Sequence, residues 1–296
     1  MSFFRYAAFA LGATFLAAAA AVRIGNFRWS RGTARAVEIL ATPEIDGPPS
    51  LAFSLEELDG LPEPVARYFR YALTLGQRRI RRATLEQIGT MRSDVRKPWA
   101  PFRAVQKVAT RPPSFIWDAT MPIGPLVSLR IRDAYLSGEG ASEASIAGII
   151  PIGRVRGSAE VASASLVRYL AEAAWLPTAL LPSKNLNWTA IDEQNARVTL
   201  TDARTTVSID VRFGSAGEIE SISTMRYRDD HGMLVLTPWA GRYRDYRRVA
   251  GMMIPMAAEV GWTIGESAAS YWRGEITDIR YEFELAEFRP LLAASI

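Results

Sequence analysis

The pattern of apolar and polar positions divides the chain into an apolar start, a short helical region and a long series of strands. Residues 6–22 form an uncharged run. A helical region follows, because Ser54 and Glu57 fit a capping box and the apolar residues of 65–73 are spaced to form one stripe. From Ile80 onward, runs of β-branched and aromatic residues separated by turn residues indicate strands.

Roughly ten strands are expected in the second part of the chain, with no regular alternation of strand and helix. The clearest are 80–94, 102–110, 115–121, 126–132, 196–200, 206–213, 218–227, 260–264 and 271–285. One helix interrupts them; Ser163 or Ser165 can cap it, and Pro182 ends it. We therefore predict an α+β fold, in which a large curved antiparallel β-sheet, half-barrel or barrel-like, carries a few packed helices.

The apolar start allows three interpretations. As a helix, the 17 residues of 6–22 span about 25 Å, just short of the ~30 Å hydrocarbon core of a bilayer. The run is rich in alanine, and residues 18–20 would serve as a signal-peptide cleavage site. The alternatives are an uncleaved membrane anchor, a cleaved signal and a buried helix of a soluble protein.

We expect an anchor or signal with its basic flank over residues 1–45, and a single α+β domain over 46–296. Residues 45–50 form a Pro- and Gly-containing linker. The expected location is the bacterial inner membrane, with residues 6–22 as the contact. The arginines that follow the run oppose export, so the side of the membrane is open; we lean to the extracytoplasmic side.

Composition narrows the chemistry. The chain has 35 Lys+Arg against 31 Asp+Glu, a net charge of +4, no cysteine and one histidine. Disulfides, thiolate sites and multi-histidine metal sites are therefore excluded within one chain, and we expect no metal and no cofactor. Residues 1–45 contain five arginines against two glutamates, so the domain itself is nearly neutral. That weakens a nucleic-acid-binding interpretation.

No motif supplies a catalytic centre. His231 lies in a turn-like cluster with Asp229 and Asp230, and no Gly-x-Ser-x-Gly accompanies it, so a solvated hairpin turn is the better interpretation. The sequence at 138–140 is a lone Gly-x-Gly, which we interpret as a turn. Arginines and tyrosines alternate in 239–248, but we prefer a solvated strand face to a single-strand nucleic-acid surface. We assign no catalytic residue.

The helix near residue 170 carries the best candidates for a site. Arg168 and Glu172 stand four residues apart on one helix face, with Trp175 three beyond. They are either a surface ion pair beside a core tryptophan or, if the helix lies across a concave sheet, groups that line a cavity.

Tryptophan is the second candidate feature. Seven of the eight tryptophans lie in the predicted domain. They either fill the core of a wide sheet or line an apolar pocket, in which aromatic walls accompany a few polar groups. The candidate ligand-binding residues are Arg168, Tyr169, Glu172, Trp175, Trp188, Trp239, Trp262 and Trp272.

Four motifs occur along the chain in a recognisable order: Leu-Pro-Glu-Pro-Val-Ala-Arg-Tyr at 61–68, Arg-Tyr-Leu-Ala-Glu at 168–172, Trp-Leu-Pro-Thr-Ala-Leu-Leu at 175–181 and Tyr-Trp-Arg-Gly at 271–274. Together they resemble a family of uncharacterised bacterial proteins, a domain of unknown function with an N-terminal membrane segment. The resemblance covers about residues 55–285, and it implies no established activity. A looser fold analogy is with lipoprotein-localisation carriers, whose curved antiparallel sheet wraps around helices and holds acyl chains.

Three functions follow as hypotheses. The first is a membrane-anchored binding module for a lipid-like or other apolar ligand in an aromatic-lined cavity. The second is a carboxylate-dependent hydrolase-type enzyme that uses Glu172 with Arg168. The third is a structural or interaction protein of the envelope. We favour the first, because the sequence combines a tryptophan-rich sheet and an apolar start with no nucleophile–base signature.

Overall fold

The computed structural model describes residues 2–41, 52–94, 96–125, 127–265 and 267–284, with the side chains of the first helix from residue 16 onward. The predicted linker at 45–50 lies outside the described residues. The helices are α1 (Ser2–Ala41), η1 (Leu55–Leu58), α2 (Glu63–Ala72), α3 (Ala159–Glu172), η2 (Ala173–Trp175) and η3 (Pro177–Leu180), where η marks a 3₁₀ helix.

The strands form one antiparallel sheet, thirteen strands wide in the part of the chain described, in the order β6-β5-β4-β3-β2-β1-β13-β12-β11-β10-β9-β8-β7. They are β1 (Ile80–Met91), β2 (Ala100–Thr110), β3 (Pro113–Pro122), β4 (Ser128–Leu136), β5 (Glu139–Ile146), β6 (Ile150–Arg156), β7 (Leu186–Ala190), β8 (Asn195–Asp202), β9 (Thr205–Phe213), β10 (Ile219–Asp230), β11 (Met233–Val249), β12 (Met252–Ile264) and β13 (Ser267–Phe283). The predicted large antiparallel sheet with few helices is confirmed. Three strands were not foreseen: β5, β6 and β7.

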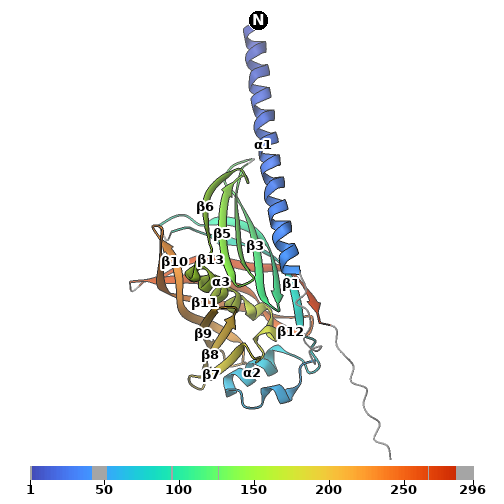
Figure 1. Ribbon diagram of the computed structural model, residues 1–296, viewed down its shortest axis with the longest axis vertical. Helices are drawn as coiled ribbons and strands as arrows, with labels where there is room; N and C mark the ends of the chain where they lie inside the picture. Colours follow the sequence, from blue (N-terminus) through green and yellow to red (C-terminus); the bar gives the residue numbers. More distant parts are fainter. Residues whose placement is uncertain (1, 42–51, 95, 126, 266, 285–296) are drawn as a thin grey trace, which may run out of the picture.

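The sheet curls around α3, which lies inside the curve (Figure 1). The helix packs against β4 and β5 near one edge of the sheet and against β9 and β10 near the other. The two sides also meet directly, because the hydroxyl of Tyr135 on β4 donates a 2.7 Å hydrogen bond to Asp202 at the end of β8. The result is a half-barrel that uses a helix to fill its interior.

Local sequence explains where α3 begins and how it is held. Ser158 caps the helix, its side chain accepting from the backbone N–H of Val161; the predicted caps Ser163 and Ser165 lie within the helix. After Glu172 the chain tightens into η2, and the indole N–H of Trp175 donates to the carbonyl of Pro255 on β12 at 2.9 Å. The end of α3 is therefore fixed to the middle of the sheet.

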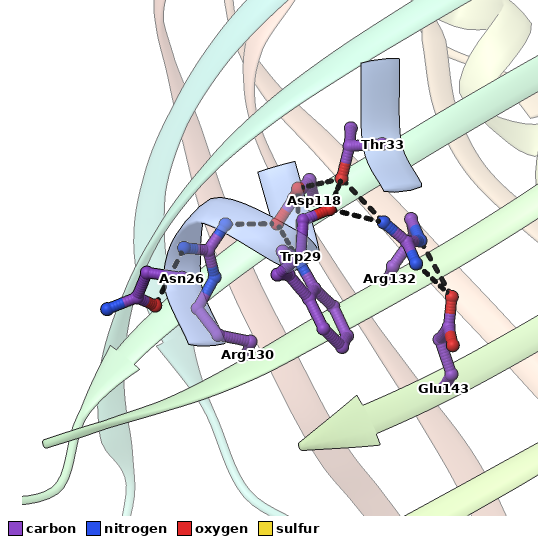
Figure 2. A network of polar contacts seen from close by, with 7 residues as sticks. All are labelled: Asn26, Trp29, Thr33, Asp118, Arg130, Arg132 and Glu143. Carbon is purple, nitrogen blue, oxygen red and sulfur yellow. Dashed lines mark hydrogen bonds and ion pairs between the residues drawn. The ribbon is translucent and has the colours of Figure 1, made fainter. Parts of the chain in front are cut away.

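The second half of α1 packs on the outer face of β2, β3 and β4 through a polar network (Figure 2). Asp118 of β3 accepts hydrogen bonds from the indole N–H of Trp29 at 3.1 Å and from the hydroxyl of Thr33. Arg130 donates to the same carboxylate, and the guanidinium of Arg132 lies over the Trp29 ring, 4.5 Å from its centre. Buried polar side chains need hydrogen-bond partners at fixed positions. This network therefore allows only one register of α1 along the strands.

The expectation of a membrane-spanning helix over residues 6–22 is not confirmed. The backbone is helical there as part of α1, and the side chains of residues 6–15 lie outside those described. Among the described residues, no helix combines the length and the hydropathy needed to cross a membrane.

Asp118→Ala tests the docking of α1. The change leaves the largely buried Arg130 without its carboxylate, so we expect the free energy of unfolding to fall by about 2–4 kcal/mol. Trypsin should then cut faster at Arg31 and Arg35. Asp210→Ala, which breaks the exposed Arg197–Asp210 pair, is the control and should cost under about 1 kcal/mol in urea unfolding. Equal losses from the two variants would contradict the proposed role of Asp118.

Candidate functional site

A cavity of about 230 Å³ lies between α3 and the concave face of the sheet. Its wall is formed by residues of α3 and η2 and of strands β1, β3, β4 and β10 to β13. It is lined by Met91, Trp117, Asp133, Arg168, Ala171, Glu172, Trp175, Arg226, Trp239, Tyr243, Ala258, Val260, Trp262, Tyr271 and Trp272. Five of these are tryptophans, so the wall is mainly aromatic, with a small number of charged groups.

Arg168 is the central charged group. Its Nε donates to Glu172 at 2.8 Å and its Nη1 to Asp133 of β4 at 2.5 Å, while only 15% of its side chain is exposed. The guanidinium also lies 4.8 Å from the centre of the Trp117 ring and 5.1 Å from that of Phe115. Two carboxylates and two aromatic faces therefore hold one cation between helix and sheet.

Amide side chains extend this ion pair into the sheet. Gln106 of β2 donates to the second oxygen of Glu172 and accepts a 3.0 Å hydrogen bond from Gln87 of β1. Gln87 in turn accepts from the indole N–H of Trp117 at 2.8 Å. Both glutamines are buried, and each has a partner on either side, so the polar groups beneath the cavity are satisfied.

This arrangement keeps the charges fixed. Burial lowers the pKa of Arg168, but the charges of Glu172 and Asp133 more than offset it, and the pKa ends above its usual range. Each oxygen of Glu172 accepts a hydrogen bond, one from Arg168 and one from Gln106. A carboxylate engaged at both oxygens is poorly placed to take a proton from a substrate.

The other side of the cavity is aromatic, with Arg226 beside it. Trp262 stacks on Tyr271 with ring centres 5.5 Å apart and an interplanar angle of 15°. The Tyr271 hydroxyl accepts from the indole N–H of Trp239 at 3.1 Å and from Arg226 at 3.0 Å. The Arg226 guanidinium lies 5.0 Å from the centre of the Trp239 ring. A cation and a hydroxyl thus sit beside apolar walls.

Six of the eight predicted ligand-binding residues line this cavity: Arg168, Glu172, Trp175, Trp239, Trp262 and Trp272. Two lie elsewhere in the core. Tyr169 is buried on a different face of α3, and the indole N–H of Trp188 donates to the carbonyl of Leu180, with its ring against Phe213. Sequence reasoning missed Trp117, Asp133, Arg226, Tyr243 and Tyr271 in the cavity wall.

Other sequence features lie where the patterns indicated. His231 occupies the turn between β10 and β11 with a φ of +55°. Along β11, Trp239 and Tyr243 point into the core while Arg242 and Arg244 are exposed. Because these rings are buried, they are not available to stack on nucleic-acid bases.

Arg168→Met tests the ionic centre. The variant leaves Glu172 and Asp133 poorly exposed without their cation, so we expect a loss of about 3–5 kcal/mol in the free energy of unfolding at neutral pH. Arg197→Met, which breaks an exposed pair, should cost under about 1 kcal/mol in the same urea titrations. A loss from Arg168→Met no larger than that from Arg197→Met would contradict the importance of the ionic centre.

Tyr243→Phe tests the alkaline limit of stability. Burial, followed by the charge of Glu172, raises the pKa of Tyr243 above its usual range. A raised folded pKa keeps stability intact below about pH 10 and loses it above, because only the unfolded tyrosine ionises there. The variant should remove about 1.4 kcal/mol per pH unit from the fall in unfolding free energy between pH 10 and 11.5. Identical slopes in urea unfolding for variant and wild type would refute this.

Comparisons with known proteins agree with the motifs. No curated protein matches the chain. Among solved structures, a LolA superfamily protein from Nitrosomonas europaea is 12% identical, with 74% of this chain and 92% of that chain covered and a TM-score of 0.40. A DUF1329 family protein from Desulfovibrio piger is 10% identical, with 77% and 89% covered and a TM-score of 0.36. Residues 59–281 match a family of unknown function, DUF6920, and the chain belongs to that family.

Proposed function

We propose that this protein binds an apolar, lipid-like ligand in the cavity between α3 and the sheet. The observation that carries the proposal is the composition of the wall, with five tryptophans and a polar base whose charges are paired within the protein. Transfer of an apolar ligand from water to such a surface is favourable. The charged groups at the base keep their partners within the protein when the ligand binds, so none is left unsatisfied.

The polar groups suggest how the ligand is oriented. Arg168 is paired with two carboxylates, so it forms part of the base of the cavity and is not available to bind a negatively charged group of the ligand. Arg226 and the Tyr271 hydroxyl lie beside the stacked rings and can receive a polar end group. An apolar body with one polar end therefore fits better than a uniformly apolar molecule.

Size limits the ligand class. A cavity of about 230 Å³ is smaller than the roughly 300–1,000 Å³ of pockets for drug-sized molecules. It suits a single short acyl chain or a small apolar molecule, and excludes a bulky polycyclic ligand unless the sheet opens.

The two alternative functions are less well supported. A hydrolase that uses Glu172 needs a carboxylate able to accept a proton, and both oxygens of Glu172 already have donors. An envelope interaction protein needs no internal cavity. We retain the bacterial inner membrane, with the domain on the extracytoplasmic side, as the proposed location, because a protein that binds lipid-like molecules has its ligands at hand beside a membrane.

Val260→Trp tests the binding proposal. Val260 lines the cavity, and the indole ring of the variant should occupy the space that the ligand takes. Dodecanoate added to the wild-type protein should quench tryptophan fluorescence saturably, and Val260→Trp should bind at least about tenfold more weakly, a difference of about 1.4 kcal/mol.

Val105→Trp is the matched control, since it makes the same substitution at an exposed position of β2. It should bind dodecanoate as the wild type does. The proposal fails if neither dodecanoate nor dodecanol binds and no lipid is found by mass spectrometry of extracts from the purified chain. It fails equally if both tryptophan variants bind like the wild type.

A further inference from the structure

We propose that the end of the domain from which α1 emerges lies against an anionic lipid surface, with the β3–β4 and β5–β6 hairpin tips in the headgroup region. This inference concerns the outside of the domain and does not depend on the cavity.

The topology brings three segments together at this end. Strands β3 and β5 run toward it and β4 and β6 run away, so the two hairpin tips are neighbours. The backbone N–H of Ala147 in one tip donates to the carbonyl of Ser128 beside the other at 2.7 Å. Gly25 of α1 is packed so closely on Ala147 and Gly148 that no Cβ would fit there. Figure 1 shows α1 continuing past these hairpins, away from the sheet.

The surface at this end is unusually apolar. Ile123 of the first tip is 53% exposed, and Ile149, Ile150 and Ile152 at the second are 47%, 56% and 54% exposed. Ile24 and Phe27, on either side of the contact between α1 and the hairpin, are also exposed. Large aliphatic side chains that gather in this way on a surface mark a site of interaction.

Charge selects the kind of partner. The sequence has no acidic residue in 16–28, 121–130 or 144–154, the three segments that meet at the two hairpin tips. Arg23 and Arg28 of α1 and Arg154 of β6 are all exposed. A surface that combines isoleucines with cations and no carboxylates matches the headgroup region of an anionic bilayer.

Two observations favour lipid over another protein. A second copy of this chain would present the same cations and repel them. The uncharged residues 6–22 lead directly away from the surface along α1, so an apolar segment and the apolar tips point toward the same phase. Contact in the headgroup region requires no helix that crosses the membrane.

The absence of cysteine makes a direct test possible. Ile123→Cys, Ile150→Cys and Ile191→Cys in the full chain each allow one environment-sensitive NBD label. Ile191 is the matched control, since it is 49% exposed and follows β7, at the far end of the molecule from the start of α1. With vesicles of phosphatidylglycerol and phosphatidylcholine, labels at 123 and 150 should brighten and shift to the blue, while the label at 191 should not.

Co-sedimentation with the same vesicles completes the test. The double variant Arg23→Glu/Arg154→Glu should bind roughly 10- to 30-fold more weakly, because each cation near an anionic surface contributes on the order of 1 kcal/mol. The proposal is wrong if the chain does not sediment with the vesicles. It is also wrong if the chain sediments while the labels at 123 and 150 stay unchanged, which means that α1 binds alone, or if the label at 191 responds equally.

Discussion

The buried cation of Arg168 is the constraint on which the interior of this protein depends. A charge with little exposure is stable only where its partners have fixed geometry, and its two carboxylates come from different elements, Glu172 on α3 and Asp133 on β4. Gln106 and Gln87 continue the contact to β2 and β1. The angle and depth of α3 inside the half-barrel are therefore set by polar contacts on one side, which leaves the aromatic side room for a cavity.

The sequence alone was sufficient to predict α3 and the antiparallel type of the sheet. The alternation of Val207, Ile209 and Val211 with polar residues marks a half-buried strand, and the structure has β9 there. Strands β5 and β6 were missed because one is rich in alanine, serine and glutamate and the other contains Pro151 and Gly153, so neither has a strong strand propensity. The pairing of β5 with β4 and of β6 with β5 overrides the local preference.

The candidate site shows the same limit. Spacing along a helix placed Arg168, Glu172 and Trp175 together, because helical geometry is local. Asp133 and Tyr271 join them only through strand register, and nothing in one sequence fixes which residues of distant strands face each other. Trp188 shows the opposite error, a residue predicted to line the cavity that does not. Its indole N–H donates to the carbonyl of Leu180 in the core.

The two edges of the sheet differ in a way that bears on how the protein behaves at high concentration. An open sheet leaves unpaired backbone groups along its first and last strands, where another chain could add. The edge strand β7 is only five residues long, and β6 carries Pro151, which has no N–H, together with Arg154 and Arg156. Neither edge offers a long, flat, neutral template, so a half-barrel that never closes on itself can remain a single sheet at high protein concentration.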